Sequence, residues 1–392
     1  MCKALFKSLD GGAHWSPSGL TNAPISALAA DPRIPTTLYA GYECGGLVKS
    51  TDGGAGWRSA EVGLTRNAVY TRPILLALTI DPTAPDTVIA STDTGIFMST
   101  DGGDAWRDLN AGFAASTLVR DPTDPRILYA IVNLGTGDTL RRSTDGGISW
   151  AVVPTGFVAE TIAVDPTTST TLYAGVGAYL STPGTVFKST DGGGGWSKLT
   201  LGFPGAGTIY RITIDPRTPS TVYAGTDVGV FKSTDGGASW NHEFASPASV
   251  YALVIDRATS TTLYAGTSGS NGRGVLRSTD GGTTWSDFNH GLRISFTSVL
   301  VTAPHTPDTL YAGGDGGSIF VIQPVAVCAG DCDGAGGVTV DDIVTMVNVA
   351  LGDADVTSCV AGDSNEDGAI TVDEVLAAVN NALNVTCIAR IP

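Results

Sequence analysis

One string of residues recurs seven times along this chain of 392 residues, and it constrains the fold more than any other feature. The string is Ser-Thr-Asp-Gly-Gly-x-x-Trp, or one change from it, and successive aspartates lie 42 to 49 positions apart. A repeat of this length indicates that the chain stacks copies of one small structural unit. The seven aspartates are Asp10, Asp52, Asp101, Asp145, Asp191, Asp235 and Asp280.

A second string lies between these copies, an alternating apolar run that ends in Asp-Pro and leads into Thr-Leu-Tyr-Ala-Gly, as in Ile212 to Gly225. Alternation of apolar and polar residues, rich in β-branched and aromatic side chains, is typical of strands. The 51 glycines and 20 prolines also argue against long helices. Each unit therefore predicts four short strands, named A to D in chain order.

Four strands in about 45 residues is the size of a β-propeller blade. The sequence therefore predicts an all-β, seven-bladed β-propeller over residues 1–323. The chain starts with a C and a D strand (Ala4 to Ser8 and around Trp15) and its repeats end with A and B strands, so we expect the two ends to complete one blade. Ser318 to Ile322 reads as an eighth C strand without an Asp motif. Either it competes with Ala4 to Ser8, or the chain starts inside a longer gene, which would also explain the absence of a signal peptide.

The sevenfold Ser-Thr-Asp-Gly-Gly-x-x-Trp resembles the Asp-box, or BNR, repeat of sialidases, family 74 xyloglucanases, sortilin-type receptors and the photosystem II assembly factor of cyanobacteria and plants. The resemblance covers residues 1–322 and is specific to the repeat, not to one function. Because every blade has the motif, its aspartates are expected to be structural: each accepts hydrogen bonds from its own C–D turn, and the two glycines permit φ > 0.

The candidate ligand face is the face opposite the Asp-box turns. In a four-stranded blade the B–C and D–A connections emerge there, and here they vary most in length, as binding loops on a rigid scaffold do. The alternative is that each acidic residue only stabilises its own glycine-containing turn. The acidic and polar candidates follow strand B, namely Glu43, Asp93, Asn133, Asp227 and Asp315, and the basic and aromatic ones are Arg66, Tyr70, Arg72, Tyr179, Tyr210, Arg211 and Arg273. Such a rim would suit a sugar or a peptide.

No catalytic residue is assigned. The Phe-Arg-Ile-Pro segment of sialidases is absent, and the nearest string, Asp31 to Pro35, falls on the Asp-box face. Family 74 enzymes place paired carboxylates between two propellers, and this chain has one. The four histidines lack ligand spacing. An enzyme is therefore the less favoured reading, and if the chain is one, we expect a glycoside hydrolase.

The C-terminal residues 324–392 differ in composition: residues 328–387 hold 11 acidic side chains, four of the six cysteines and no Lys or Arg. Residues 363–374 fit the twelve-residue EF-hand loop for calcium, and residues 331–342 form a weaker copy with Ala335 at the fifth position. An amphipathic helix is expected after each loop. The predicted ligands are Asp331, Asp333, Gly337 and Asp342 in the first loop, and Asp363, Asn365, Asp367, Ala369, Thr371 and Glu374 in the second.

Two loop–helix units in about 60 residues resemble a type I dockerin, which implies a small α-helical calcium-binding domain and a cohesin-like protein partner. Four cysteines are not a usual dockerin feature. Cysteines and calcium loops both suit an extracellular or cell-surface location. The acidic net charge of −16, without a basic stripe, argues against nucleic acid as a partner, and no apolar run is long enough to span a membrane.

Three functional hypotheses follow. The preferred one is a secreted or surface-displayed binding protein, whose propeller recognises a glycan or a protein and whose calcium module anchors it. The second is a polysaccharide-active hydrolase or its accessory subunit. The third is an assembly factor for a larger complex.

Overall fold

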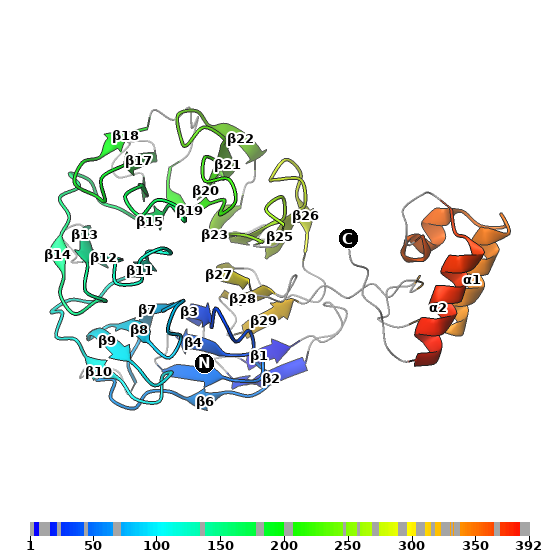
Figure 1. Cartoon of the computed structure of the whole chain (residues 1–392), viewed down its shortest axis with the longest axis horizontal. Helices are drawn as coiled ribbons and strands as arrows, with labels where there is room; N and C mark the ends of the chain where they lie inside the picture. The colour runs from blue at the N-terminus through cyan, green and yellow to red at the C-terminus, as the bar shows by residue number, and fades with distance from the viewer. Residues whose placement is uncertain are drawn as a thin grey trace. The chain divides into compact units, whose positions relative to one another are not determined.

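The computed structural model describes residues 4–7, 16–21, 25–42, 46–65, 72–133, 138–177, 184–199, 207–245, 248–256, 259–268, 274–288, 296–302, 310–314, 318–322, 330, 332, 338–363 and 369–384. The fold divides into two compact units, one formed by residues 16–321 with the N-terminal strand and one formed by residues 322–392. The first is a ring of antiparallel sheets and the second contains the helices (Figure 1).

Six sheets of the ring have four strands each, in chain order from the axis outwards (Figure 1). The first two blades are β3 (Ile25–Ala30), β4 (Leu38–Tyr42), β5 (Leu47–Ser50), β6 (Arg58–Ser59), and β7 (Leu75–Ile80), β8 (Val88–Thr92), β9 (Gly95–Ser99), β10 (Arg107–Asp108). The third and fourth are β11 (Thr117–Arg120), β12 (Leu128–Asn133), β13 (Asp138–Ser143), β14 (Ala151–Val152), and β15 (Thr161–Val164), β16 (Leu172–Val176), β17 (Thr185–Ser189), β18 (Ser197–Lys198). The fifth and sixth are β19 (Ile209–Ile214), β20 (Val222–Thr226), β21 (Gly229–Ser233), β22 (Asn241–Ala245), and β23 (Ser249–Ile255), β24 (Leu263–Ser268), β25 (Val275–Ser278), β26 (Ser286–Asp287).

The prediction of seven four-stranded blades is wrong, because the ring has six blades of four strands. Its remaining sheet has three strands, β27 (Thr297–Thr302), β28 (Leu310–Gly314) and β29 (Ser318–Ile322), and β27 packs against β3 of the first blade. The strand expected from Ala4 to Ser8 does not pair with this sheet. Instead β1 (Ala4–Lys7) and β2 (Ser16–Thr21) form a hairpin of their own. The reason is competition: β29 follows β28 directly in the chain and takes the C-strand position.

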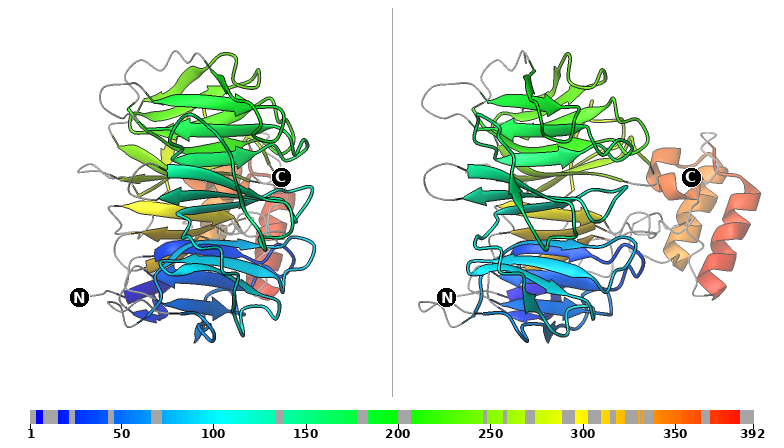
Figure 2. Two further views of the ribbon diagram at one scale, coloured as in Figure 1. Left: turned by 90° about the vertical axis from the view of Figure 1, so that its left-hand side faces the viewer. Right: turned by 60° about the vertical axis from the view of Figure 1, so that its left-hand side comes forward.

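The inner strands of the ring pack closely because most B strands have a glycine near their end. A Cβ atom on Gly225 of β20 would lie 2.9 Å from a side-chain atom of Val250 in the next blade. A Cβ atom on Gly313 of β28 would likewise lie 2.9 Å from Ile25 in β3. Glycine is therefore the residue that lets the neighbouring inner strand approach. Side-on, the sheets lie face to face (Figure 2), which is why all five residues of β20 are buried.

The Asp-box forms the turn between strands C and D. In the fifth blade the hydroxyl of Ser233 donates to Asp235 Oδ1 (2.8 Å) and accepts from the backbone N–H of Gly237 (2.8 Å). Asp235 in turn accepts from the backbone and the hydroxyl of Ser239, which lowers the pKa of its carboxyl to about 2. The pattern of the Ser hydroxyl bonded to the Asp-box carboxylate repeats at Asp52, Asp101, Asp145, Asp191 and Asp280, whereas Asp10 lies outside the described residues.

The Asp-box turn also joins each blade to its neighbour. The hydroxyl of Tyr223 and the ammonium of Lys232 both donate to the carbonyl of Gly281 in the next Asp-box (3.1 and 2.7 Å). Tyr39 with Lys49, and Tyr173 with Lys188, bind the next blade in the same way. The second blade has isoleucine and methionine at these positions, and there Arg120 pairs with Asp81 across the seam instead (3.3 Å).

The C-terminal unit contains α1 (Val340–Ala350), the 3₁₀ segment η1 (Val356–Gly362) and α2 (Val372–Asn384). The two expected helices are thus present, around a small core of Met346, Cys359, Ile370 and Ala378. A disulfide joins Cys332 to Cys359. The expected dockerin-like domain is nevertheless not evident: the unit shows two short helices, and most of each loop that would define such a domain lies outside the described residues. No described helix is long and apolar enough to cross a membrane.

Candidate functional site

The candidate ligand face is only partly described. Arg72, Asp93, Tyr210, Arg211 and Asp227 lie within the described residues, as does the backbone of Asn133. The other candidates, Glu43, Arg66, Tyr70, Tyr179, Arg273 and Asp315, lie outside them. On the opposite face, the C–D and A–B turns of a blade are joined by a hydrogen bond. The N–H of Gly236 in the Asp-box donates to the carbonyl of Ser220 in the A–B turn of the same blade (2.8 Å). The B–C turns therefore emerge at the candidate face.

Two of the acidic candidates hold the start of their own inner strand. Asp93, just after β8, accepts from the backbone N–H of Ile74 (3.0 Å), which precedes β7. Asp227, just after β20, accepts from the N–H of Gly207 with both carboxylate oxygens (2.9 and 3.0 Å). Both carboxylates thus tie the D–A connection to the B–C turn, which is the structural alternative to a ring of ligand-binding acids.

Arg72 lies in the connection between the first two blades. Its guanidinium is 3.7 Å from the carboxylate of Glu61, and its side chain is about half exposed. The hydroxyl of Tyr42 is nearby, and burial raises its pKa well above the usual range. This pair is separate from the aromatic residues of the later blades, since nothing in the described residues connects them.

The structure assembles a row of aromatic rings that only one candidate belongs to. The rings of Tyr210 and Tyr251 are stacked with centroids 4.2 Å apart, and the ring of Phe296 meets Tyr251 edge-on at 5.0 Å. Tyr210 is the second residue of the inner strand β19, Tyr251 is in β23, and Phe296 bridges to Ser268 just before β27. The row therefore runs across three neighbouring sheets near the ring axis (Figure 1). All three side chains are partly exposed.

A bulge places the tyrosines of the aromatic row. The pairing of β19 with β20 shifts between Ile209 and Arg211, and that of β23 with β24 shifts between Val250 and Ala252, so the extra residue in each case is a tyrosine. A bulged residue is turned away from the regular alternation. Burial raises the pKa of Tyr210 to about 12, with further contributions from Tyr251 and from the negative charge of Asp227. Asp227 therefore belongs to the surroundings of the row.

Arg211 follows Tyr210 directly and is exposed to solvent. Its pKa is nevertheless lowered, because surrounding protein displaces water from its guanidinium. Arg211 is on β19, the innermost strand of its blade (Figure 1).

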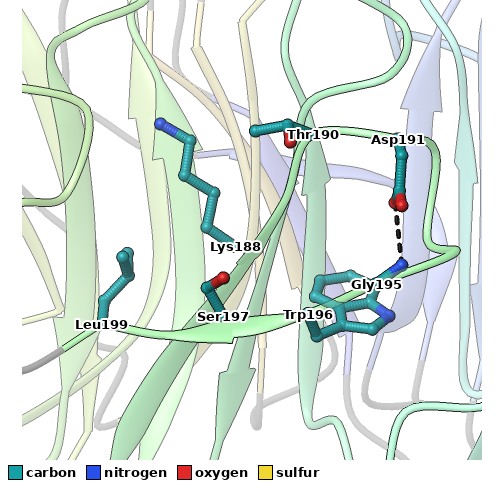
Figure 3. Close-up of a pocket in the computed structure, with 7 residues that line it drawn as sticks. All are labelled: Lys188, Thr190, Asp191, Gly195, Trp196, Ser197 and Leu199. Carbon is teal, nitrogen blue, oxygen red and sulfur yellow. Dashed lines mark hydrogen bonds between the residues drawn. The ribbon is translucent and has the colours of Figure 1, made fainter.

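The Asp-box face has a hollow of about 400 Å³ at the fourth blade (Figure 3). Two of its polar groups make hydrogen bonds within the propeller. Asp191 accepts from the N–H of Gly195, as the dashed line shows, and Lys188 donates to the carbonyl of Gly236 in the next blade. We therefore assign the hollow to the architecture. Its lining residues are Lys188, Thr190, Asp191, Gly195, Trp196, Ser197 and Leu199.

Half of the predicted calcium ligands are described. Asp342 ends the first loop and accepts from the backbone and hydroxyl of Thr339, and Glu374 ends the second and accepts from Thr371 in the same way. Asp342, Asp363 and Glu374 are all buried, and Ala369 lies at the start of the described part of the second loop. Asp331, Asp333, Gly337, Asn365 and Asp367 lie outside the described residues. Within them, no group of three or more metal-binding side chains is assembled.

Comparison with known proteins gives the fold. No family model matches this chain, and no curated protein does. Among solved structures, the extracellular domain of BT4673 from B. thetaiotaomicron is similar at a TM-score of 0.60 and 14% identity, over 82% of this chain and 39% of that one. YCF48 bound to D1 peptide is similar at 0.56 and 14% identity, over 75% and 91%.

A GH74 enzyme from Niastella koreensis is similar at a TM-score of 0.48 and 19% identity, over 76% of this chain and 56% of the enzyme. The chain thus spans little more than half the length of that enzyme. At such identities the likenesses show the fold alone. Together with the sheet topology, the likenesses to BT4673 and YCF48 show that the ring is a β-propeller.

Proposed function

We propose that this chain is an extracellular binding protein whose propeller recognises a carbohydrate at the aromatic row, Tyr210, Tyr251 and Phe296. The row is the observation that carries the proposal. Partly exposed aromatic rings on a rigid scaffold offer flat apolar faces to the C–H groups of a sugar ring, and tyrosine adds a hydroxyl for polar contacts. The extracellular location is supported by the disulfide and by the similarity to an extracellular domain.

Binding fits the site better than hydrolysis. A glycoside hydrolase needs two carboxyl groups that face the substrate, one of which gives or takes a proton. The two described acids of the candidate face, Asp93 and Asp227, each accept backbone N–H groups of their own blade. An assembly role remains the alternative that YCF48, bound to a peptide, illustrates.

Replacing Tyr251 by alanine is expected to weaken carbohydrate binding by about fivefold, because a stacked aromatic contact contributes about 1 kcal/mol. Affinity electrophoresis of the full chain against a panel of soluble polysaccharides measures this. Tyr251→Phe keeps the ring and should retain most of the binding. Ile148→Ala, at an exposed residue of an Asp-box turn, is the matched control. Equal binding by Tyr251→Ala and the wild type would place the carbohydrate elsewhere, and release of shorter sugars would indicate a hydrolase.

The C-terminal unit is proposed to bind calcium and to anchor the chain to a protein partner. The buried carboxylates Asp342, Asp363 and Glu374 are hard oxygen donors of the kind that Ca²⁺ prefers, and a buried carboxylate needs a cation or hydrogen bonds around it. When bound, the ion would supply positive charge to these acids. Apolar side chains are also exposed at the helix ends: Val340 at the start of α1, Leu351 just after it and Val372 at the start of α2 are 71 to 75% exposed. Such apolar surface suits a protein partner, and a cohesin-like one is the partner to test first.

Glu374→Gln is expected to lower the calcium affinity of this unit by about tenfold or more, since it removes one charged ligand. Calcium titration by calorimetry, with the loss of helical circular dichroism on heating as a second readout, measures the effect. Asp373→Asn is the control, because Asp373 is the exposed neighbour of Glu374. A wild-type chain that neither binds calcium nor gains stability from it would refute the assignment.

A further inference from the structure

Arg211 stands where the other sheets place a small, uncharged residue. Its partner in the register is Gly225, and the residues paired with the equivalent position of strand B in the other sheets are Ala27, Ala77, Thr117, Thr161, Ala252 and Val299. Alanine therefore satisfies the packing of the ring at this point. The other sheets pack without a long cationic side chain at this position, so the packing of the ring does not require one at Arg211.

No described residue neutralises Arg211. Other described arginines pair with carboxylates or lie over aromatic rings, among them Arg58, Arg72, Arg120, Arg126, Arg141 and Arg142. For Arg211 no hydrogen bond, ion pair or ring contact is present among the described residues, and loss of water is the sole cause of its lowered pKa. Although the chain has a net charge of −16, none of its described carboxylates pairs with this arginine on the innermost strand of the blade.

A guanidinium that the surrounding protein partly desolvates gains from an anion that replaces the lost water. Its planar donors match the two oxygens of a carboxylate, and such charge-assisted pairs are stronger where water is partly excluded. Tyr210 is the adjacent residue and stacks on Tyr251. Arg211 and Tyr210 are thus neighbouring positions of β19, at the bulge where the register shifts between Ile209 and Arg211.

We propose that Arg211 binds the carboxylate of an acidic sugar, of the uronic acid type, whose ring lies against the aromatic row. The inference rests on the proposed carbohydrate binding and names the class of ligand. A peptide carboxylate would meet the guanidinium equally well, but the adjacent aromatic row favours a sugar ring. The predicted ligands are polysaccharides with exposed uronic acids.

The test measures binding of the full chain to oligogalacturonides and to the same oligosaccharides with their carboxyl groups reduced to alcohols. We expect the acidic forms to bind at least tenfold tighter, with an affinity that falls as salt is added. Arg211→Ala should lower the affinity for the acidic forms by about 10- to 100-fold and leave that for the reduced forms unchanged. Arg211→Lys should recover part of the loss. Arg217→Ala is the control, at an exposed arginine of an A–B turn on the other face.

Each other outcome overturns the proposal in a distinguishable way. Equal binding of acidic and reduced forms, unaffected by Arg211→Ala, would remove the carboxylate site and leave carbohydrate binding intact. If the chain bound neither form, and also bound none of the soluble polysaccharides used to test Tyr251→Ala, the proposed function itself would be rejected. Arg211-dependent binding of acidic peptides, with none of oligogalacturonides, would assign the site to a protein ligand.

Discussion

Replacing Cys359 by serine is expected to unfold the C-terminal unit and leave the propeller folded. Cys359 is almost fully buried in a core that has four buried residues among those the structure describes, and its disulfide to Cys332 closes a loop of 27 residues. A loop of that length contributes about 3 to 4 kcal/mol through the entropy of the unfolded chain. A unit with so small a core has little other stability to offset that loss. Helical circular dichroism and calorimetry should show the loss of one transition.

The same disulfide also links the two loops. The N–H of Cys332 donates to the carboxylate of Asp342 (2.8 Å), and Cys359 lies four residues before Asp363. Reduction of the wild-type protein should therefore reproduce the effect of the serine variant. Val344→Ala, at an exposed residue of α1, is the control, and it should leave both transitions in place. If Cys359→Ser kept a cooperative C-terminal transition near that of the wild type, the disulfide would not be what stabilises this unit.

Gly314→Ala is expected to destabilise the propeller by about 3 kcal/mol, at the upper end for added volume in a packed site. A Cβ atom on Gly314 would lie 1.9 Å from the carbonyl oxygen of Phe296 and 3.0 Å from the Cα atom of Thr297. These are backbone atoms, so no side chain can move aside to relieve the clash. The three-stranded sheet that closes the ring would have to shift, and Phe296 of the aromatic row would move with it. Chemical denaturation measures the stability.

The matched control is Gly195→Ala, in the Asp-box turn of the fourth blade. There the nearest atom to an added Cβ is Asp191 Oδ2 at 3.3 Å, and other blades have serine or threonine at the same place, as at Ser149 and Thr284. Gly195→Ala should therefore leave stability nearly unchanged. If Gly314→Ala were equally mild, the close contact that shapes the closing sheet would be absent in solution. Polysaccharide binding by folded Gly314→Ala should also be weaker than by Gly195→Ala, because Phe296 is displaced.

The repeat predicted the propeller because local patterns encode strands and tight turns. The Asp-box residues specify their own turn through hydrogen bonds over four residues, as Ser233 and Asp235 show. Ring closure could not be predicted in this way. The segments at Ala4 to Lys7 and Ser318 to Ile322 have the same strand pattern, and which one pairs with β28 depends on chain connectivity, which favours the segment that follows directly in the chain.

The candidate site was predicted in part. Loop variability pointed to Tyr210 and Arg211, but it missed Tyr251 and Phe296, which precede or lie within strands and not in the long loops. The signal was available: Tyr251 has the same place in its blade as Tyr210, one residue after the first buried residue of the inner strand. What alignment of the repeats could not show is that bulges turn these residues toward each other across the seam. Nor could it show that Asp93 and Asp227 bond their own backbone.

Hydrogen exchange of the full chain, with and without the polysaccharide that binds it most tightly, tests the central claim most directly. The claim is that the ligand occupies the aromatic row beside the ring axis. We expect slower exchange in the peptides that contain the starts of β19 and β23, around Tyr210 and Tyr251, and unchanged exchange in the Asp-box turns. Protection confined to the Asp-box turns, for example around Lys188 and Trp196, would contradict the account and place the ligand on the opposite face.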